Sequence, residues 1–494
     1  MALMTEHFDV VIVGAGISGI SAAYHLQKEC PNKSYVLLER RDDLGGTWDL
    51  FRYPGIRSDS DMYTLGFHFK PWNSARGIAD GGAIKNYLRE AVEENGIDKH
   101  VRYGQKVLNA DWSDADNQWT LNIDVDGEQS QITAGFAMVC TGYYNYDQGY
   151  RPAFPGEENF TGTLVHPQHW PENLDYQGKK VVVIGSGATA VTLLPALANS
   201  GAGHVTMLQR SPTYIGALPG IDPLTEKTLK FLPASVASIV NRTYKVGFST
   251  VQYQLSRRFP GYMRKTLLTM AKHKLPKGYD VEKHFGPRYN PWEQRVCLAP
   301  DGDIFKTIRK GQASVVTDTI ETFTPTGIKL SSGEELEADI IITATGLDMQ
   351  IGGGATITRN GQPIDLSESM LYKTAMLTGV PNATVTIGYL NASWTLKADL
   401  LSEWACRLLK YMDDHGYNKV VPEAPADVTP LPYTQEFSSG YLQRAMPKLP
   451  KSGDSGPWRV KQNYLHDVKV LRFDKIEDDA LHFSHHRAAE PVNA

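Results

Sequence analysis

Two stretches of the chain place apolar and polar residues in the same order. Residues 8–26, FDVVIVGAGISGISAAYHL, run from a continuous apolar segment through Gly-x-Gly-x-x-Gly into apolar positions at helical spacing. Residues 179–197, KKVVVIGSGATAVTLLPAL, repeat this order with Ala190 in place of the third glycine. A short apolar run bounded by glycines indicates a strand buried on both faces, and the period after it indicates a helix. Each stretch is therefore expected to form a strand, a tight turn and a helix.

Each copy also reaches a later apolar strand that ends in Thr-Gly. These strands are FAMVCTG, residues 136–142, and DIIITATG, residues 339–346. The second copy is longer than the first, and a segment of helical pattern at about residues 218–285 lies inside it. Strands that alternate with helices predict a parallel sheet with helices on its faces. The predicted fold class is therefore α/β, with two doubly wound, Rossmann-like domains and a helical insertion.

A polar residue after the next strand of each copy indicates which dinucleotide the domain binds. A glycine motif alone is weak evidence, because such a site also needs a helix N-terminus for the pyrophosphate and a polar group for the ribose. After the first turn, the strand SYVLLER ends at Glu39, whose carboxylate suits a ribose hydroxyl of FAD or NAD. After the second turn, HVTMLQRS ends at Arg210 and Ser211, which suit the 2′-phosphate of NADPH.

These assignments predict an NADP-binding domain inserted in an FAD-binding domain. We place the first part of the FAD domain at residues 1–148 and the NADP domain at 149–345. The second part of the FAD domain follows at 346–494 and includes a C-terminal tail.

Composition and charge narrow the class of protein. The chain has 494 residues, of which 41% are hydrophobic and 21% charged, as is usual for a globular protein of two or three domains. A net charge of −5 argues against general nucleic-acid binding. The four cysteines lie far apart without a Cys-x-x-Cys pair, so we expect reduced thiols, no metal site and no dithiol redox centre. No signal peptide and no membrane-spanning run is recognised, so a cytoplasmic location is expected.

The segment between residues 39 and 70 is crowded with glycine, proline, aspartate and serine, as in a surface loop. It also carries Trp48, Phe51, Tyr53 and Phe67 among charged residues, which is more aromatic surface than a solvated loop retains. We therefore interpret it as a wall around a flat, charged cofactor.

A second unusual segment is FTGTLVHPQHWP, residues 160–171, which precedes the second glycine turn. A linker selected only for flexibility would be rich in glycine and serine and would not carry a Trp-Pro pair. The pattern favours a structured joint, in which His166 is equally well interpreted as an interdomain histidine with no part in catalysis.

Together these motifs resemble the type I Baeyer–Villiger monooxygenases, a branch of the class B flavoprotein monooxygenases, and most closely its mycobacterial members. Residues 160–171 match the fingerprint of that branch, and GGTWDLFRYPGIRSDSDMYTLGF, GYYNYD, IGSGATAV, YNPWEQR and NASWTLKADL match further motifs. The resemblance implies an enzyme that uses FAD, NADPH and O2 to insert oxygen beside the carbonyl of a hydrophobic ketone, with oxidation of thioethers as a side activity. The expected product is an ester or a lactone.

The resemblance also assigns residues to the cofactors. For FAD it implies contacts with the first glycine turn, the strand end after it, the following loop and one backbone position in the strand GQKVLNADW: Gly14, Gly16, Ser18, Gly19, Glu39, Thr47, Trp48, Asp59 and Val107. Asp49, Leu50 and Ser58 belong to the same predicted cofactor-binding set. For NADPH it implies the second glycine turn, the strand end after it and one loop residue: Ser186, Gly187, Ala188, Thr189, Ala190, Val191, Thr192, Arg210, Ser211 and Arg57.

Two residues are expected to carry the chemistry. Arg295 matches the family's essential arginine, and its permanently charged guanidinium suits the stabilisation of negative charge during oxygen transfer. Asp59 is expected to orient it. Without the resemblance, Arg295 would be interpreted as a surface charge.

Two other functions remain open at this stage. One is an N- or S-oxygenating flavin monooxygenase, against which Trp170-Pro171 and Arg295 argue. The other is a flavin-binding redox sensor without catalysis, which would consume NADPH without an oxygenated product.

The helical insertion is also open to two interpretations. Between residues 222 and 280, 11 Lys and Arg residues stand against 3 Asp and Glu residues, with large apolar residues between them. A solvated basic face is the simpler interpretation, and peripheral contact with a membrane or with a hydrophobic substrate is the alternative.

Overall fold

The structure is a computed structural model that describes residues 5–485, so part of the predicted C-terminal tail lies outside the described residues. Within that range, nine strands form the first sheet, in which the parallel core β2-β1-β6 carries an antiparallel extension through β5 and β4. Its strands are β1 (Glu6–Val13), β2 (Tyr35–Leu38), β3 (Val101–Arg102), β4 (Gln105–Ser113), β5 (Gln118–Val125), β6 (Glu128–Val139), β17 (Thr356–Arg359), β18 (Gln362–Pro363) and β21 (Ala383–Val385).

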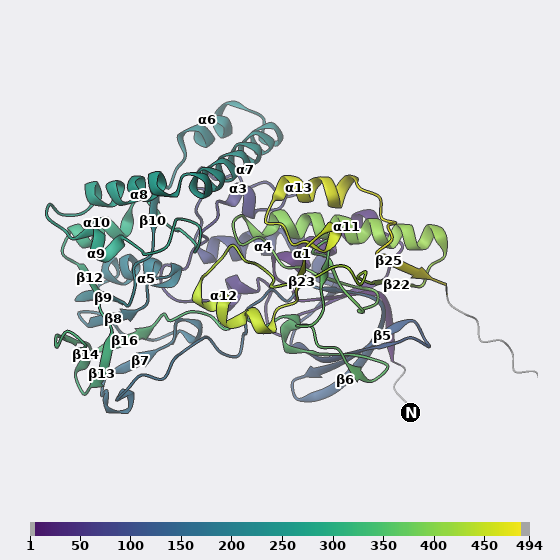
Figure 1. Cartoon of the computed structure of the whole chain (residues 1–494), viewed down its shortest axis with the longest axis horizontal. Helices are drawn as coiled ribbons and strands as arrows, with labels where there is room; N and C mark the ends of the chain where they lie inside the picture. The colour runs from purple at the N-terminus through teal and green to yellow at the C-terminus, as the bar shows by residue number, and fades with distance from the viewer. Residues whose placement is uncertain (1–4, 486–494) are drawn as a thin grey trace, which may run out of the picture.

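A second sheet of five parallel strands has the order β12-β9-β8-β16-β7. Its strands are β7 (Thr163–Val165), β8 (Lys180–Ile184), β9 (His204–Gln209), β12 (Ala313–Thr317) and β16 (Ile340–Thr343). The two sheets lie toward opposite ends of the long axis of the molecule (Figure 1). All strands of the second sheet fall between residues 163 and 343, whereas β17, β18 and β21 return to the first.

The predicted fold class is therefore confirmed, with one doubly wound unit inserted in another. The boundaries at residues 148 and 345 stay a prediction. Strands β4, β5 and β6 form an antiparallel meander that the strand–turn–helix pattern did not predict.

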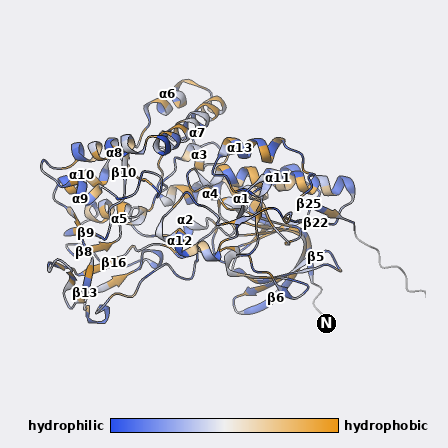
Figure 2. Cartoon of the chain, viewed as in Figure 1, coloured by the Kyte–Doolittle hydropathy of each residue, from blue (hydrophilic) through white to orange (hydrophobic). Residues whose placement is uncertain are grey.

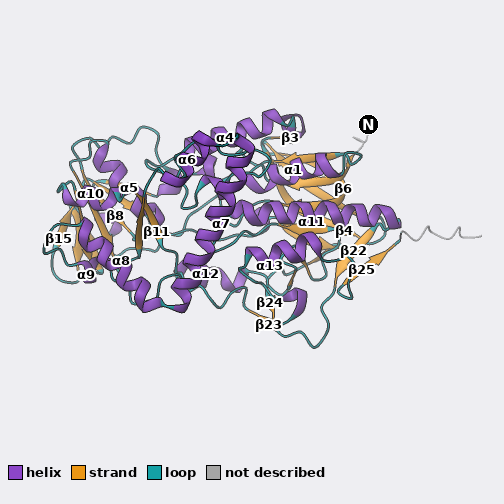
Figure 3. Ribbon diagram, turned by 90° about the horizontal axis from the view of Figure 1, so that it is seen from above, coloured by secondary structure: helices purple, strands orange, loops and turns teal. Residues whose placement is uncertain are grey.

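Helices cover both sheets. They are α1 (Ile17–Glu29), α2 (Thr47–Leu50), α3 (Met62–Leu65), α4 (Gly81–Glu94), α5 (Ala188–Asn199), α6 (Pro223–Phe231), α7 (Ala234–Arg258), α8 (Pro260–Lys274), α9 (Val281–Phe285), α10 (Asp303–Arg309), α11 (Trp394–His415), α12 (Gly440–Ala445) and α13 (Tyr464–Val468). Helices α6 to α9 make up the predicted helical insertion, and α6 to α8 lie along one side of the molecule (Figures 1 and 3). Within residues 5–485, every helix is too short or too polar to cross a bilayer.

Smaller strand pairs complete the fold. They are β10 (Ile215–Leu218) with β11 (Cys297–Pro300), β19 (Leu371–Tyr372) with β20 (Met376–Leu377), β22 (Lys419–Pro422) with β25 (Leu481–Ser484), β23 (Pro430–Leu431) with β24 (Ser452–Gly453), and the three-stranded β13 (Ile320–Thr324), β14 (Gly327–Leu330) and β15 (Glu335–Glu337).

The chain crosses between the two sheets twice, and the two crossings run side by side. The backbone N–H of Asn145 donates to the carbonyl of Asp348 at 3.0 Å, and that of Gln350 donates to Tyr143 at 3.0 Å. Tyr144 and Met349 form an antiparallel bridge between these bonds. The inserted unit therefore leaves and re-enters the first at neighbouring points.

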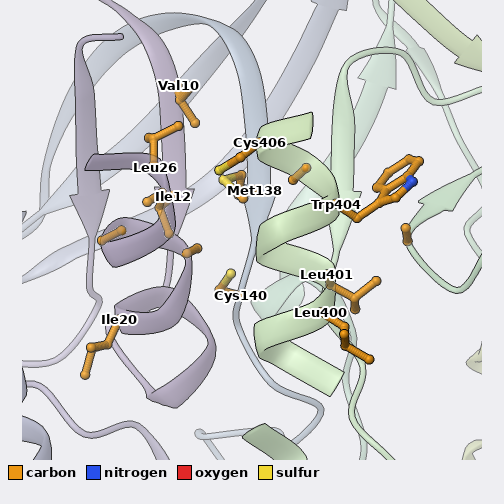
Figure 4. Close-up of a cluster of buried hydrophobic side chains, with 14 of the residues drawn as sticks. Val10, Ile12, Ile20, Leu26, Met138, Cys140, Leu400, Leu401, Trp404 and Cys406 are labelled. Carbon is orange, nitrogen blue, oxygen red and sulfur yellow. The ribbon is translucent and has the colours of Figure 1, made fainter. Parts of the chain in front are cut away.

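The core of the first unit is built from both ends of the chain. Ile20 and Leu26 of α1 pack with Leu400, Leu401 and Trp404 of α11 against Val10, Ile12 and Met138 of the sheet (Figure 4). All eight side chains are at most 2% exposed, and such burial contributes roughly 1.5–3 kcal/mol for each large apolar side chain. This packing fixes α1, and with it the first glycine turn, against the sheet.

Candidate active site

A cavity of about 290 Å³ lies where the two glycine turns approach each other. Residues of the first turn, of the loop after α2, of the second turn and of the segment before β11 all face it. Of the residues predicted from the sequence, those lining it are Gly14, Gly16, Ser18, Glu39, Thr47, Trp48, Arg57, Ser58, Asp59, Val107, Ala188, Thr189, Thr192 and Arg295.

Both turns have the geometry of a pyrophosphate cradle. Gly14 has φ +104°, and a Cβ placed on it would lie 2.7 Å from the carbonyl oxygen of Cys140. Gly185 has φ +138°, and its Cβ would lie 2.2 Å from that of Ala344. Helices α1 and α5 begin directly afterwards, and neither has a side chain capping its N-terminus. The free N–H groups of both helix starts can therefore bind anionic phosphate.

Glu39 holds the first turn in place at the end of β2. Its carboxylate accepts hydrogen bonds from the backbone N–H of Ala15 at 2.8 Å and of Arg41 at 2.9 Å. Burial raises the pKa of Glu39, and these two hydrogen bonds oppose the effect. Because the carboxylate also lines the cavity, it is positioned as a dinucleotide ribose would require. Turn, helix start and acid together fit the predicted FAD.

The loop after α2 connects the two units. Burial raises the pKa of Tyr53 to about 12, and its hydroxyl meets Thr192 and Thr189 of α5. Arg57 forms an ion pair with Asp303 of α10. The Nε atom of Arg57 is buried and has no hydrogen-bond partner within the described chain, although the residue lines the cavity. A bound cofactor would supply a partner that the protein does not.

Asp59 and Arg295 face each other across this cavity. Arg295 Nη1 lies 4.0 Å from Asp59 Oδ2, and 38% of the Arg295 side chain is exposed, toward the cavity that it lines. Burial raises the pKa of Asp59, against the attraction of Arg295 and Arg57. Burial also disfavours the charged form of Arg295, but Tyr143, Tyr441 and Asp59 outweigh it and raise its pKa further. The site therefore holds a permanent cation in a protein-lined space.

Aromatic side chains form the wall around this cation. Tyr143, Tyr144 and Tyr146 line the cavity, and the hydroxyls of Tyr143 and Tyr144 are 3.2 Å apart. Burial raises the pKa of Tyr144 to about 12 and that of Tyr143 well above its ordinary value. Both hydroxyls therefore stay protonated and neutral.

Several lining residues come from the last third of the chain and were not identified from the sequence. Tyr389 and Trp394 are the largest, and Gln350 also lines the cavity. Trp394 donates its Nε1–H to Ser18 Oγ at 2.7 Å, directly at the start of α1. The motif NASWTLKADL contained this tryptophan, and only the family resemblance marked it.

Other predicted residues lie outside the cavity. The carboxylate of Asp49 is bound by Arg41 and Lys85 at 2.5 Å each, and Leu50 packs in the core of the second unit. The remaining ones lie in, or next to, the glycine turns and do not line the cavity: Gly19, Ser186, Gly187, Ala190 and Val191. Of these, Ser186 is partly accessible and Gly187 is exposed. For Asp49 and Leu50, a cofactor contact is left to the backbone.

Arg210 and Ser211 are both exposed at the end of β9, away from the cavity. The hydroxyl of Ser186 donates to the carbonyl of Ser211 at 2.9 Å, which ties the second glycine turn to this strand end. No ion pair of Arg210 is found among residues 5–485. Its guanidinium is therefore available to an anionic ligand at the surface, and the 2′-phosphate role stays a prediction.

The segment 160–171 makes structural contacts and does not reach the cavity. Gln168 is 3% exposed and donates its side-chain amide to the carbonyl of Asn145 at 2.8 Å, so it ties the segment to the crossing between the sheets. Trp170 packs against the core of the second unit. Burial lowers the pKa of His166, whose Nδ1 accepts from the backbone N–H of Gln168 at 3.2 Å. These contacts suit a joint and offer no proton to the cavity.

Comparison with known proteins gives consistent matches. The family model described as "Flavin-binding monooxygenase-like" matches residues 78–217, and the "NAD(P)-binding Rossmann-like domain" matches residues 12–76. The chain is 67% identical over 487 residues to the FAD-containing monooxygenase EthA of Mycolicibacterium smegmatis, covering 98% of this chain and 99% of the relative. It is 58% identical over 482 residues to EthA of Mycobacterium tuberculosis, with 97% and 98% covered.

Solved structures share the fold at low identity. A structure of OTEMO in complex with FAD and NADP matches with a TM-score of 0.75 at 20% identity, covering 97% of this chain and 100% of that one. An oxidised steroid monooxygenase bound to NADP matches with a TM-score of 0.70 at 21% identity, covering 85% and 88%. A cyclohexanone-bound cyclohexanone monooxygenase matches with a TM-score of 0.69 at 21% identity, covering 85% and 89%.

Proposed function

Since the chain belongs to the family of FAD-containing monooxygenases that includes EthA, we propose that it is an NADPH-dependent Baeyer–Villiger monooxygenase. It would insert one atom of O2 beside the carbonyl of a hydrophobic ketone and release an ester or a lactone. Thioethers would be oxidised as a side activity. The bound flavin supplies the oxygen chemistry.

Membership of the family confirms the predicted flavin monooxygenase and its FAD cofactor. The non-catalytic redox sensor considered from the sequence is therefore set aside. NADPH agrees with the NADP held by the solved structures of the same fold and with the second glycine turn. In this arrangement, α1 and Glu39 would hold FAD, and α5 with Arg210 would hold NADPH.

One observation carries the Baeyer–Villiger proposal. The guanidinium of Arg295 and the carboxylate of Asp59, 4.0 Å apart, face the cavity onto which both glycine turns open. Transfer of oxygen to a ketone carbonyl develops negative charge, and a fixed cation in a protein-lined space stabilises such charge far better than water does. We assign Arg295 this role, and Asp59 holds the guanidinium toward the reacting atoms.

The cavity wall supports an apolar substrate. Tyr143, Tyr144, Tyr389 and Trp394 line it, and the three tyrosine hydroxyls stay neutral because burial raises their pKa. Such a wall binds a hydrophobic ketone or thioether and excludes water from the reacting centre. A cytoplasmic location remains our proposal, supported by the four cysteines, which are free and buried.

The direct test is product analysis. Purified enzyme is supplied with NADPH in air and with linear, cyclic and aryl ketones and a matched aryl thioether, and the products are identified by gas chromatography and mass spectrometry. The proposal expects esters or lactones from at least one ketone class, with one atom from labelled O2. Sulfoxide from the thioether without ester from any ketone would contradict it and would indicate an N- or S-oxygenating monooxygenase.

A further inference from the structure

Large apolar side chains are exposed almost entirely on one part of the molecule. Fifteen such side chains are exposed in the described chain, and twelve of them lie between Ile221 and Tyr262, on and beside helices α6 to α8. Among them, Phe231 is 72% exposed, Ile239 68% and Tyr262 71%. A concentration of exposed large apolar side chains on one part of a surface normally marks a site that another body covers.

Helix α7 shows that the exposure is systematic. Val236, Val240, Phe248, Val251 and Leu255 recur at intervals of three, four or eight residues, which places them on one side of the helix. Of the 25 residues of α7, four are buried, and they are a mixture of polar and apolar side chains: Ala237, Asn241, Tyr253 and Ser256. An ordinary surface helix turns its large apolar side chains inward, whereas α7 buries only Tyr253 among its own.

The exposed side continues beyond the insertion. Helix α13 lies beside α7 in both views of the molecule (Figures 1 and 3) and exposes Leu465 to 62%, and Phe473, shortly after α13, is 76% exposed. Figure 2 shows hydrophobic residues alternating with strongly hydrophilic ones along α6, α7 and α8. The surface is therefore mixed apolar and charged.

The charges on this part of the chain are mostly positive. Between residues 222 and 280, 11 basic residues stand against 3 acidic ones, although the whole chain has a net charge of −5. Lys245, Arg264 and Arg242 form ion pairs with Asp222, Glu282 and Asp399. The other eight have no ion pair with any residue in the described range: Lys227, Lys230, Arg257, Arg258, Lys265, Lys272, Lys274 and Lys277.

We propose that the face formed by α6, α7 and α8 docks on the surface of an anionic phospholipid bilayer. A helix that turns an apolar side outward among lysines and arginines is suited to the boundary between lipid headgroups and acyl chains. Anionic headgroups pair with the eight free cations, and Phe231, Ile239 and Tyr262 enter the apolar layer beneath. Every helix here lies along the surface and none spans the bilayer.

A second copy of the chain is a poorer occupant. In a two-fold dimer the same patch meets itself, so the excess of positive charge on one copy would face the same excess on the other. Like charges brought together at an interface oppose association. A bilayer surface carries the opposite charge and also accepts the apolar side chains.

Co-sedimentation with vesicles tests the proposal. The full-length enzyme is incubated with vesicles of equal parts phosphatidylglycerol and phosphatidylcholine, and separately with phosphatidylcholine alone. Wild type is expected to sediment with the anionic vesicles and to be released by high salt. The double variant Ile239→Glu/Val251→Glu should bind at least tenfold more weakly, and Arg258→Ser/Lys265→Ser roughly 25-fold more weakly, at about fivefold for each cation.

Matched controls separate docking from damage to the fold. Tyr103→Glu replaces an exposed apolar side chain elsewhere, and Lys329→Ser removes a surface cation of β14. Both should bind vesicles like wild type, and all variants should keep their flavin absorbance. The proposal would be overturned if wild type did not bind the anionic vesicles, or if the two double variants bound them as tightly as wild type does. A third outcome would also overturn it: wild type does not bind vesicles but forms a dimer in sedimentation velocity, and the Ile239→Glu/Val251→Glu variant is a monomer. That result would favour a second copy of the chain as the occupant.

Discussion

Replacement of Arg295 by alanine should separate reduction of the flavin from oxygen transfer to the substrate. The side chain faces the cavity, 4.0 Å from Asp59, and contacts neither glycine turn. NADPH and FAD would be held chiefly by the helix starts at α1 and α5, which the substitution leaves in place. We therefore expect Arg295→Ala to bind FAD and to accept reducing equivalents from NADPH at a rate within a few fold of wild type.

The size of the effect on oxygen transfer follows from the other cations of the cavity. The other cations that line it are Arg57, which is held by Asp303, and Arg40 and Lys106, which both pair with Asp147. None of the three is free to take the place of a lost guanidinium. Removing one donor that stabilises an anion slows an enzyme by about 10²–10³-fold, which corresponds to about 2.7–4 kcal/mol. Since a full charge is lost here, ester formation should fall by at least about 10³-fold.

The assay measures three rates on the same preparation. Anaerobic stopped-flow absorbance follows flavin reduction, gas chromatography follows the ester, and a peroxidase-coupled assay follows hydrogen peroxide released in air. Arg295→Ala should show near-normal reduction, almost no ester and increased hydrogen peroxide. Arg309→Ala, which removes an exposed cation at the end of α10, is the control and should match wild type in all three.

Two outcomes would refute this reasoning. Ester formed by Arg295→Ala at a rate near wild type would mean that the guanidinium is not the group that stabilises the developing charge. Loss of flavin reduction to the same extent as loss of ester would mean that Arg295 serves mainly to place the nicotinamide.

Three further outcomes are expected. Arg210→Ala should lose about 1–3 kcal/mol of preference for NADPH over NADH, which is the scale of a charge-assisted hydrogen bond. If wild type had the same kcat/KM with NADPH as with NADH, the 2′-phosphate assignment would be refuted. Trp170→Ala should keep FAD but release more hydrogen peroxide per NADPH oxidised, because Trp170 anchors to the second unit the segment that Gln168 ties to the crossing between the sheets. Loss of flavin with unchanged coupling would contradict this. Burial disfavours protonation of His25, but Asp399 and Glu29 outweigh it and raise its pKa to about 9 from the ordinary 6.5. Because the pKa of His25 is higher in the folded than in the unfolded protein, its contribution to stability is fully present below pH 6.5 and is lost as the pH rises through 9. The free energy of unfolding, measured in urea, should therefore fall by about 3 kcal/mol over this range, and that of His25→Gln should change less with pH.

The parts of the site that lie close together in the sequence were predictable. The two glycine turns, Glu39 and the loop through Asp59 each depend on short-range rules, because the φ angle of a glycine and the start of a helix are set within a few residues. All of them line or border the cavity.

The parts of the site that depend on contacts between residues far apart in the sequence were not predictable. Trp394 reaches Ser18 only because α11 packs on α1, and no local pattern around residue 394 indicates that partner. Arg295 lies in a loop whose composition resembles any charged surface, so its place depends on the family resemblance alone. The exposed apolar positions of α7 have the period of an ordinary amphipathic helix, and periodicity does not tell which side faces the protein.

The discontinuous core of the first unit sets an order of events during synthesis. Residues 163–343 emerge from the ribosome as one uninterrupted block, so the second sheet can close as soon as β16 is free. The first sheet must wait for β21 and for α11, which are made roughly 10 to 50 s after β6 at about 5–20 residues per second. During that interval the apolar faces of β1, β6 and α1 lack their partner helix. A nascent chain that has emerged as far as a point between residues 345 and 383 therefore carries a complete second unit on an open, aggregation-prone first one.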